Sequence, residues 1–462
     1  MSDRPRKQII LGAHFPGVNN TSVWSDPAAR SQVEFDSFVH LAQTAERGKF
    51  DFFFLAEGLR LREQRGKIHD LDVVGRPDTL AILSAVAAVT THLGLAGTLN
   101  ATYHEVYELA RQLSTLDHLS GGRAAWNVVT SSDAFTGENF RRGGFLDYAD
   151  RYVRAGEFIR AARDLWDSWA EDELVADPES GRFVRTGPPG AFDHHGQQFD
   201  VRGHFPLPRS PQRHPIVLQA GDSTGGRELA AATADAIFSR HSKLAAGQAF
   251  YEDVKSRLAR YGRSRDELKI IPAATYVLGD TAEDAAEKAH HIRRQQVSPQ
   301  TAILLLEQVW NRDLSAYDAE GPLPEIDPDV SSTSIIQGRA RMHADPMKTA
   351  AEYRARAAAK GLSIRDLIID VTGRQSFIGT PTQVADQIDE FVQLDGADGV
   401  ILVPHITPLG LDDFVDDVVP LLQERGVFRS EYETTTLRDH LGLPPIRRYD
   451  QPSSWPADSA TA

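Results

Sequence analysis

The sequence has 462 residues, and its 65 Asp and Glu against 50 Lys and Arg give a formal net charge of −15. This acidic balance argues against a nucleic-acid or anionic-membrane surface and favours small substrates. The chain contains no cysteine, which excludes disulfides, thiolate metal sites and cysteine nucleophiles. It shows neither the apolar core of a signal peptide nor a run of about 18 apolar residues, so we expect a cytoplasmic protein.

Apolar runs alternate with helical periodicity along the first part of the chain. The runs predict buried strands at 7–14, 51–56, 93–98 and 124–129. The periodicity predicts helices at about 35–48, 77–91, 106–119 and 148–169. Four successive β-then-α units indicate a parallel sheet with right-handed crossovers.

The same alternation continues after an irregular segment, 177–214, which is rich in Pro, Gly, His and Arg. Further strands are expected at 215–220, 236–240, 269–278 and 399–404, and a second insertion is expected at 279–362. Helical patterns within and after that insertion cover 281–296, 301–311, the stretch following Pro381, and 411–422. Eight units predict an α/β fold, a (β/α)8 TIM barrel formed by residues 1–450, with a disordered tail at 451–462.

One stretch, PIVLQAGDSTGGRELAAATADA at 215–236, combines a buried strand, a turn of small residues and a helix start. Unpaired N–H groups and the helix dipole at such a turn favour an anion such as a phosphate. The spacing is neither GxGxxG nor that of a P-loop, so an ordinary dinucleotide fold and a P-loop are both disfavoured. By itself, the turn is equally compatible with a βα connection that binds nothing.

Residues at the carboxyl ends of barrel strands line the active site of such a fold. Most of those predicted here are neutral hydrogen-bonding groups, which suit a planar polar cofactor better than a hydrolytic metal site. They are His14, Glu57, Thr98, Asn100, Asn127, Thr130, 221–226 and His405. The sequence contains no HExxH motif, and its adjacent histidine pairs do not have metal-ligand spacing, so no metal site is predicted.

Several motifs resemble the flavin-dependent monooxygenases of the bacterial-luciferase-like superfamily, and more narrowly the nitrilotriacetate and dibenzothiophene-sulfone monooxygenase branch. The resemblance covers nearly the whole chain, and the family fold is a TIM barrel with insertions. Its motifs are GLAGTLNATYHEVYELARQLSTLDHLSGGR at 94–123, AAWNVVTS at 124–131, LDYADRYVRAGEF at 146–158, VLQAGDSTGGRELAA at 217–231, GTPTQVADQIDEF at 379–391 and YETTTLRDHLGLP at 432–444.

The resemblance implies an FMN site. Positions that contact the flavin ring in the family correspond to Glu57, Thr98 and Asn127, and Tyr152 corresponds to a phosphate ligand. Tyr148 stands where relatives often carry His, so proton handling and tyrosine packing both remain open there. The resemblance implies two further sets of site residues. The phosphate turn contains Asp222 and Ser223, with Arg227 as a possible counter-charge or surface ion-pair partner, and the substrate side contains His14, Trp24 and His405.

Within that turn, Ser223 suits a phosphate better than Asp222, because a carboxylate repels an anion unless it is turned away. His14 and Tyr148 are the candidate catalytic residues. The two insertions are long enough to form a lid and a substrate wall. Arg141, Arg142 and Arg185 could form a local cationic patch for a substrate carboxylate, although arginines in loops are usually solvated.

The resemblance further implies a two-component monooxygenase. FMNH2 would come from a separate NAD(P)H:FMN oxidoreductase and react with O2 to give a C4a-peroxyflavin, which inserts one oxygen atom into a small N- or S-containing substrate. The family is usually dimeric or tetrameric, so a homodimer or homotetramer is expected. The alternatives are a deazaflavin-dependent oxidoreductase of the same superfamily and a flavin-binding barrel without catalysis.

Overall fold

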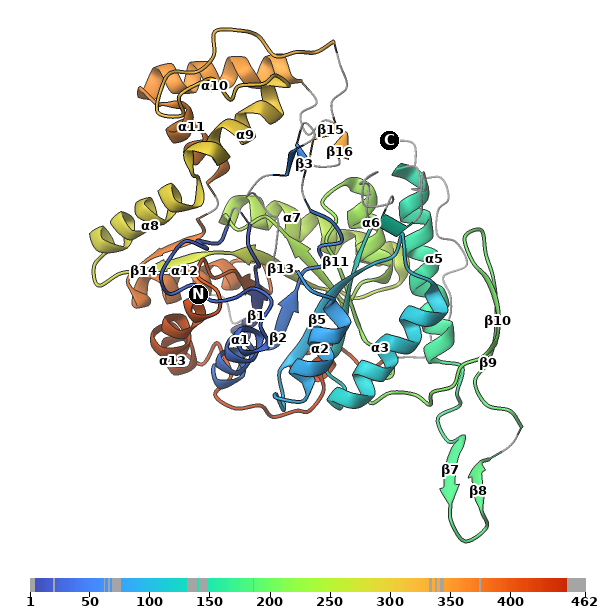
Figure 1. Cartoon of the computed structure of the whole chain (residues 1–462). Helices are drawn as coiled ribbons and strands as arrows, with labels where there is room; N and C mark the ends of the chain where they lie inside the picture. Colours follow the sequence, from blue (N-terminus) through green and yellow to red (C-terminus); the bar gives the residue numbers. More distant parts are fainter. Residues whose placement is uncertain are drawn as a thin grey trace.

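Eight parallel strands close into a barrel in the computed structural model (Figure 1). The strands follow one another around the barrel in chain order and overlap the eight predicted runs, which confirms the predicted TIM-barrel fold. They are β1 (Ile10–Phe15), β2 (Phe52–Leu55), β5 (Gly94–Asn100), β6 (Ala124–Val129), β11 (Ile216–Gln219), β12 (Ala236–Ser239), β13 (Lys269–Ala274) and β18 (Gly399–Leu402). The structure describes residues 5–19, 21–61, 63–64, 67–68, 76–130, 139–140, 148–185, 187–331, 335–336, 339–340, 345–373 and 375–446.

Helices cover the outside of the barrel, and their ends carry recognisable sequence signals. Thr380 and Gln383 form a reciprocal capping box at the start of one helix, with Pro381 at its first position. Gly121 ends another with φ of 69°, a conformation that glycine adopts without strain. The surrounding helices are α1 (Phe35–Arg47), α2 (Thr79–Ala87), α3 (Val106–Ser120), α5 (Tyr148–Trp166), α6 (Thr224–Thr233), α7 (Leu244–Arg257), α12 (Pro381–Gln393) and α13 (Val419–Glu424).

The segment between α5 and β11 forms two antiparallel hairpins. One pairs β7 (Leu174–Asp177) with β8 (Arg182–Val184), and the other pairs β9 (Ala191–His195) with β10 (Asp200–His204). Figure 1 shows the β7–β8 hairpin extending away from the barrel. This part of the chain therefore lies outside the repeat, as its composition suggested.

A helical cap interrupts the barrel between β13 and β18. It is bracketed by two short parallel strands and has its own apolar cluster, which includes Leu306, Trp310 and Ile364. In Figure 1 the last three of its helices stack above the barrel, and the first lies at the side of the barrel. Its elements are β14 (Tyr276–Leu278), α8 (Ala282–Gln296), α9 (Pro299–Trp310), α10 (Pro346–Lys360), α11 (Ile364–Thr372) and β17 (Phe377–Gly379).

Four two-residue strands join this cap to the loop after β2. Their sheet has the order β16-β15-β3-β4, so a segment near residue 64 pairs with one near residue 336. Neither stretch was predicted as a strand, because two residues are too few for a periodic pattern. They are β3 (Glu63–Gln64), β4 (Lys67–Ile68), β15 (Ile335–Ile336) and β16 (Arg339–Ala340).

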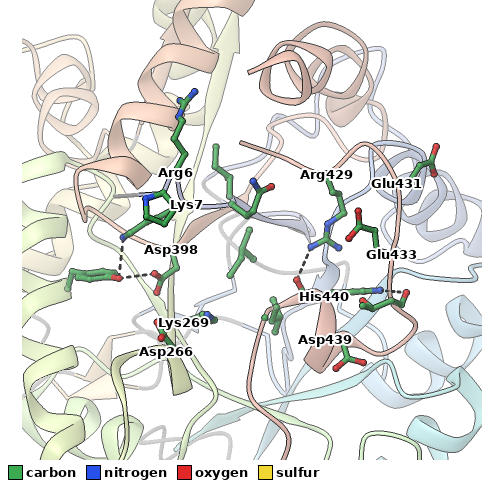
Figure 2. Close-up of a pocket in the computed structure, with 18 residues that line it drawn as sticks. Arg6, Lys7, Asp266, Lys269, Asp398, Arg429, Glu431, Glu433, Asp439 and His440 are labelled. Atoms are coloured by element: carbon green, nitrogen blue, oxygen red, sulfur yellow. Dashed lines mark hydrogen bonds between the residues drawn. The ribbon is translucent and has the colours of Figure 1, made fainter. Parts of the chain in front are cut away.

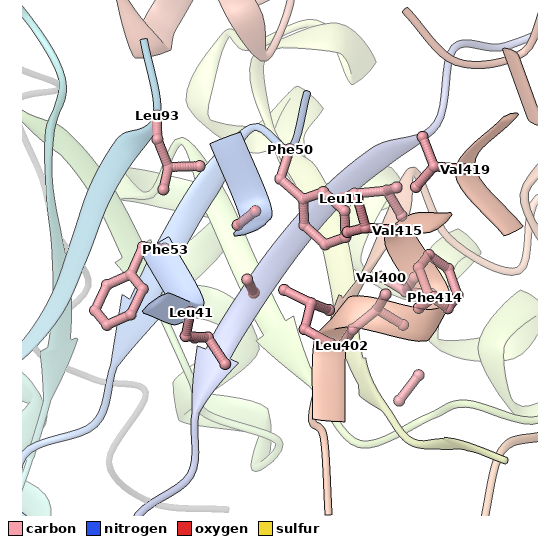
Figure 3. Packing of buried hydrophobic residues seen from close by; sticks show 14 of the residues in the cluster. Leu11, Leu41, Phe50, Phe53, Leu93, Val400, Leu402, Phe414, Val415 and Val419 are labelled. Atoms are coloured by element: carbon pink, nitrogen blue, oxygen red, sulfur yellow. The ribbon is translucent and has the colours of Figure 1, made fainter. Parts of the chain in front are cut away.

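Alternation along the strands divides the core into two layers. Leu11, Phe53 and Leu402 face outward and pack against Leu41 of α1 and Phe414 near the C-terminus (Figure 3). The alternate residues fill the barrel interior and include Ile10, Phe52, Ala96, Ala125, Leu218 and Ile401. A glycine, Gly12, is needed in β1 because a Cβ there would lie 2.6 Å from the ring of Phe52.

The C-terminal segment closes the amino-terminal end of the barrel. Leu437 of α14 (Leu437–His440) packs into the interior cluster together with Leu441 and Leu443. The family-like motif at 432–444 therefore has a structural role. In the part of the chain that the structure describes, no helix is both long and apolar enough to span a membrane.

Candidate active site

Two predicted residues meet at the carboxyl-terminal end of the barrel. Strand register places Thr98 of β5 beside Asn127 of β6, and the Asn127 Nδ2 donates a hydrogen bond of 2.8 Å to the Thr98 Oγ1. Asn127 alternates with the interior residue Ala125, so its side chain faces the inside of the barrel. Its Oδ1 is buried and has no hydrogen-bond partner among the described residues. Because a buried acceptor is costly to leave unpaired, this oxygen suits a donor from a bound ligand.

Aromatic rings form the layer around this pair. The His14 ring lies 5.4 Å from the ring of Phe54, which stacks on Phe238 with centroids 5.5 Å apart. Burial, together with the charge of Arg76, lowers the pKa of His14 to about 3. His14 is therefore neutral at physiological pH, with a buried Nδ1 that has no partner among the described residues.

Glu57 follows β2 at the same end of the barrel and faces a histidine that sequence reasoning did not single out. The His104 Nε2 lies 3.5 Å from the Glu57 Oε1. Burial raises the pKa of Glu57, and the interaction with His104 opposes this only in part. His104 belongs to the motif GTLNATYH, but nothing in the local pattern links it to a residue 47 positions earlier.

The glycine-rich turn between β11 and α6 is tightly folded. The amide of Gly221 donates to the Gln219 Oε1 at 2.8 Å, and a Cβ on Gly226 would lie 2.7 Å from the Cα of Gly221. Ser223 is the N-cap of α6, and its Oγ accepts a hydrogen bond of 3.2 Å from the amide of Gly226. Only glycine fits this close backbone approach.

Helix α5 brings a tyrosine to this turn. The Tyr152 hydroxyl lies 3.0 Å from the Ser223 Oγ, and the Cα of Gly225 faces the tyrosine ring. Two hydroxyl groups thus converge at the N-terminus of a ten-residue helix, where free N–H groups and the dipole favour an anion. The arrangement has the chemistry of a phosphate seat.

Asp222 belongs to the turn, and its carboxylate contacts an arginine and a histidine. Its Oδ1 accepts a hydrogen bond of 2.8 Å from the Arg227 Nη2 and lies 3.0 Å from the His241 Nε2. Burial by itself raises the pKa of Asp222, but His241 and Arg227 outweigh it, and the pKa falls below its usual value. Arg227 also forms an ion pair with Asp253.

Of the other predicted residues, one lies in another part of the fold, and three have side chains outside the described residues. Tyr148 is the first residue of α5, one turn before Tyr152, and its side chain lies outside the described residues, as do Arg141 and Arg142. Arg185 forms an ion pair with Asp172 beside the β7–β8 hairpin, so this arginine is committed to the hairpin.

The loop after β1 lies against the loop after β18. The amide of Val23 donates to the carbonyl of His405 at 2.6 Å, which brings the neighbourhood of Trp24 next to His405. Burial lowers the pKa of His405, and the charge of Asp26 opposes this. Trp24 itself is 58% exposed.

A pocket of about 770 Å³ lies at the opposite, amino-terminal end of the barrel (Figure 2). Two of its basic residues form ion pairs within the fold: Lys7 pairs with Asp395, and Arg429 pairs with Asp51. Active sites of this fold form at the other end of the strands. We therefore assign this pocket to the closure of the barrel. Within the described part of the chain, no cluster of three or more His, Asp or Glu side chains could hold a metal ion.

Comparison with known proteins identifies relatives that match nearly the whole chain. Residues 21–398 match the sequence profile of luciferase-like monooxygenases. The chain is 39% identical to N-acetyl-S-(2-succino)cysteine monooxygenase of Bacillus subtilis (strain 168), covering 96% of this chain and 99% of that protein. It is 38% identical to nitrilotriacetate monooxygenase component A of Aminobacter aminovorans, with 94% of each covered.

Two further similarities extend the comparison. The chain is 38% identical to dibenzothiophene-sulfone monooxygenase of Rhodococcus erythropolis, covering 97% of this chain and 99% of that protein. The crystal structure of riboflavin lyase with modified FMN and riboflavin superposes with a TM-score of 0.79 at 29% identity, covering 96% of this chain and 98% of that one. The chain is thus a monooxygenase and belongs to the luciferase-like monooxygenase family, as its motifs predicted.

Proposed function

We propose that this chain is the oxygenating component of a two-component, FMNH2-dependent monooxygenase acting on a small N- or S-containing organic substrate. The observation that carries the proposal is the meeting of Tyr152 and Ser223 at the N-terminus of α6. Two hydroxyl groups at a helix start, over a turn that admits no side chain at Gly226, fit a phosphate monoester such as that of FMN.

The ring of FMN would extend from this seat toward the barrel interior. There, the unpaired Oδ1 of Asn127 would accept a hydrogen bond from an N–H group of the ring, while Thr98 holds the Asn127 amide in place. Glu57, whose pKa is raised by burial, would lie at the edge of the ring. Bound reduced FMN supplies the chemistry of O2 activation and oxygen-atom transfer, which no protein side chain provides.

The protein's own contribution is to orient the substrate and exclude water. The stacked rings of Phe54 and Phe238 close the barrel beneath the site with apolar surface. His14 lies beside them as a neutral imidazole, able to exchange a hydrogen bond with substrate without introducing a charge. The helical cap from α8 to α11 would form the wall of the substrate pocket, which limits wasteful loss of the activated oxygen to water.

Relatives support the cofactor and the division into two proteins. The riboflavin lyase structure contains modified FMN, and one relative is named component A of a nitrilotriacetate monooxygenase. We propose an NAD(P)H:FMN oxidoreductase as the supplier of FMNH2, and a homodimer or homotetramer as the assembly. The names of the relatives refer to substrates with C–N or C–S bonds, which motivates the proposed substrate class.

Anaerobic titration with FMNH2, followed by rapid mixing with oxygenated buffer, tests the proposal. We expect tight binding, an absorbance transient of the C4a-peroxyflavin type, and faster decay of the transient with certain members of a panel of amines, thioethers and sulfones. Mass spectrometry with 18O2 should find one labelled atom in the product. Binding without oxygen consumption would favour a deazaflavin-type reductase or a non-catalytic flavin protein, and absence of binding would refute the site.

A further inference from the structure

The turn that forms the proposed phosphate seat contains a carboxylate, which a phosphate site ordinarily avoids. Asp222 directly precedes Ser223, and an uncompensated negative charge so close to the seat would weaken anion binding. The seat therefore favours a phosphate most if the surroundings of Asp222 neutralise its carboxylate and hold it in place. The residues that contact its carboxylate decide this.

Arg227 contacts Asp222 but is shared with a second carboxylate. Its Nε donates to the Asp222 carbonyl oxygen at 3.0 Å, its Nη2 to the Asp222 Oδ1 at 2.8 Å, and its Nη1 to the Asp253 Oδ2 at 2.8 Å. The guanidinium also lies over the ring of Phe250, 4.7 Å from its centroid. Arg227 is thus oriented by Asp222 and Asp253 together, and its single charge cannot neutralise both.

The ion-pair network continues from Asp253, and the formal charges of its carboxylates and guanidiniums cancel without a contribution from His241. Arg257 contacts both Asp253 and Glu228, and Arg260 contacts Glu228. The linked groups comprise three carboxylates, Asp222, Asp253 and Glu228, and three guanidiniums, Arg227, Arg257 and Arg260. Their formal charges cancel, so the network offers no net positive charge to an anion. Any surplus must come from His241.

His241 is fixed between the carboxylate and an aromatic ring. It follows β12, and its ring stacks on Phe250 with centroids 4.6 Å apart. Its Nε2 faces the Asp222 Oδ1 at 3.0 Å, so this nitrogen must carry a proton, since two acceptors cannot share a hydrogen bond. A second proton on Nδ1 would make the whole network positive by one charge.

We propose that His241 is a positioning residue for the FMN phosphate, whose imidazolium charge offsets Asp222 and gives the seat a net positive charge. The inference rests on the proposed function and adds to it a residue from the neighbouring βα loop. It predicts selectivity for flavins that carry a phosphate, expressed as the ratio of the affinities for reduced FMN and reduced riboflavin. Those two ligands differ only in the phosphate, so the ratio isolates the seat.

The experiment measures this ratio anaerobically for the full-length chain and a cycle of variants. His241→Gln keeps a donor near Asp222 but lacks the charge, and we expect it to lower the ratio roughly threefold to tenfold with riboflavin affinity unchanged. Asp222→Asn/His241→Gln restores the network charge, so the ratio should return to the wild-type value. Asp222→Asn alone should match or exceed the wild type.

A matched control is available on the β9–β10 hairpin, far from the seat. His195 is exposed and faces the carboxylates of Asp193 and Asp200, so His195→Gln removes an equivalent contact and should leave the ratio unchanged. Equal losses of FMN and riboflavin affinity in His241→Gln, or failure of the double variant to recover, would overturn the inference. A wild-type protein without preference for FMN over riboflavin would instead overturn the phosphate seat and, with it, the proposed function.

Discussion

The hydroxyl groups of Tyr152 and Ser223 lie 3.0 Å apart, although 71 residues separate them in the sequence. Ser223 owes its position to the start of α6, where it accepts a hydrogen bond from the amide of Gly226. Tyr152 owes its position to α5, which crosses the barrel surface next to α6. The contact therefore joins two βα units at the point where both helices begin.

Removing either hydroxyl should weaken FMNH2 binding. We expect Tyr152→Phe and Ser223→Ala each to raise the Kd for FMNH2 about tenfold, because hydrogen bonds to a charged group are worth about 1.5 kcal/mol or more. Isothermal titration under anaerobic conditions measures the effect. Since the two hydroxyls contact one another, the double variant should lose less than the sum of the two single losses.

Ser223→Ala also removes a helix cap, so a control must separate stability from binding. Ser363 caps α11 in the same way, with its Oγ accepting from the amide of Asp366 at 3.1 Å. Ser363→Ala should cost a similar amount of stability, about 1 kcal/mol, and leave the Kd unchanged. Equal effects of the two variants on the Kd would contradict the proposed role of Ser223.

Adjacent glycines in the turn should differ sharply in their tolerance of a methyl group. A Cβ at position 226 would lie 2.7 Å from the Cα of Gly221, whereas at position 225 the closest contact would be the Tyr152 ring at 3.7 Å. We expect Gly226→Ala to lower the free energy of unfolding by about 1 to 3 kcal/mol through backbone strain. Gly225→Ala should fold with nearly wild-type stability. Urea denaturation of both variants measures the difference, and equal stabilities would show that the turn is not tightly packed.

Sequence patterns located the strands because apolar runs and turn residues are local signals. They also marked the turn at 221–226 and the strand-end residue Asn127 as candidate site features. They did not link His104 to Glu57 or His241 to Asp222. Those contacts depend on where neighbouring loops end in space, and no spacing in the chain encodes that.

The sequence also contains a repeated aspartate to which we assigned no role. An aspartate directly precedes three barrel strands, and each accepts a hydrogen bond from a backbone amide of the adjacent strand. The pairs are Asp51 with Leu11, Asp235 with Val217, and Asp398 with Ile270. The repeated aspartate is visible in the sequence. Its role in binding a backbone amide of the adjacent strand could be assigned only from the strand register of the barrel. The pairing of residue 64 with residue 336 had no readable signal.

Buried neutral histidines should make the fold less stable in acid. Burial lowers the pKa of His440 to about 4, although a hydrogen bond to the Thr434 carbonyl opposes this. Between this value and the unfolded value of about 6.5, the unfolded chain binds a proton that the folded chain does not, so stability is complete above pH 6.5 and falls as the pH decreases. We expect a loss of about 1 kcal/mol per pH unit from this residue below pH 6.

Urea denaturation at several pH values tests this dependence. The free energy of unfolding of His440→Gln should depend less on pH than that of the wild type. The remaining dependence should come from His14, because burial also lowers the pKa of that residue. His195 is exposed, so His195→Gln should retain the full slope. A His440→Gln variant with the wild-type slope would show that His440 does not titrate in the way that burial requires.

The closure of the barrel by the C-terminal segment should depend on one buried ion pair. The Arg438 Nη2 lies 3.1 Å from the Asp235 Oδ1, while the other oxygen of Asp235 accepts from the amide of Val217 at 2.9 Å. Arg438→Met would leave a buried carboxylate without this partner, and we expect the free energy of unfolding to fall by about 3 kcal/mol. Asp235→Asn in the same chain removes the unpaired charge and should recover part of that loss. Arg265→Met, which breaks an exposed pair with Glu252, should cost no more than about 1 kcal/mol. If Arg438→Met were as mild as Arg265→Met, the ion pair would contribute nothing measurable to closing the barrel.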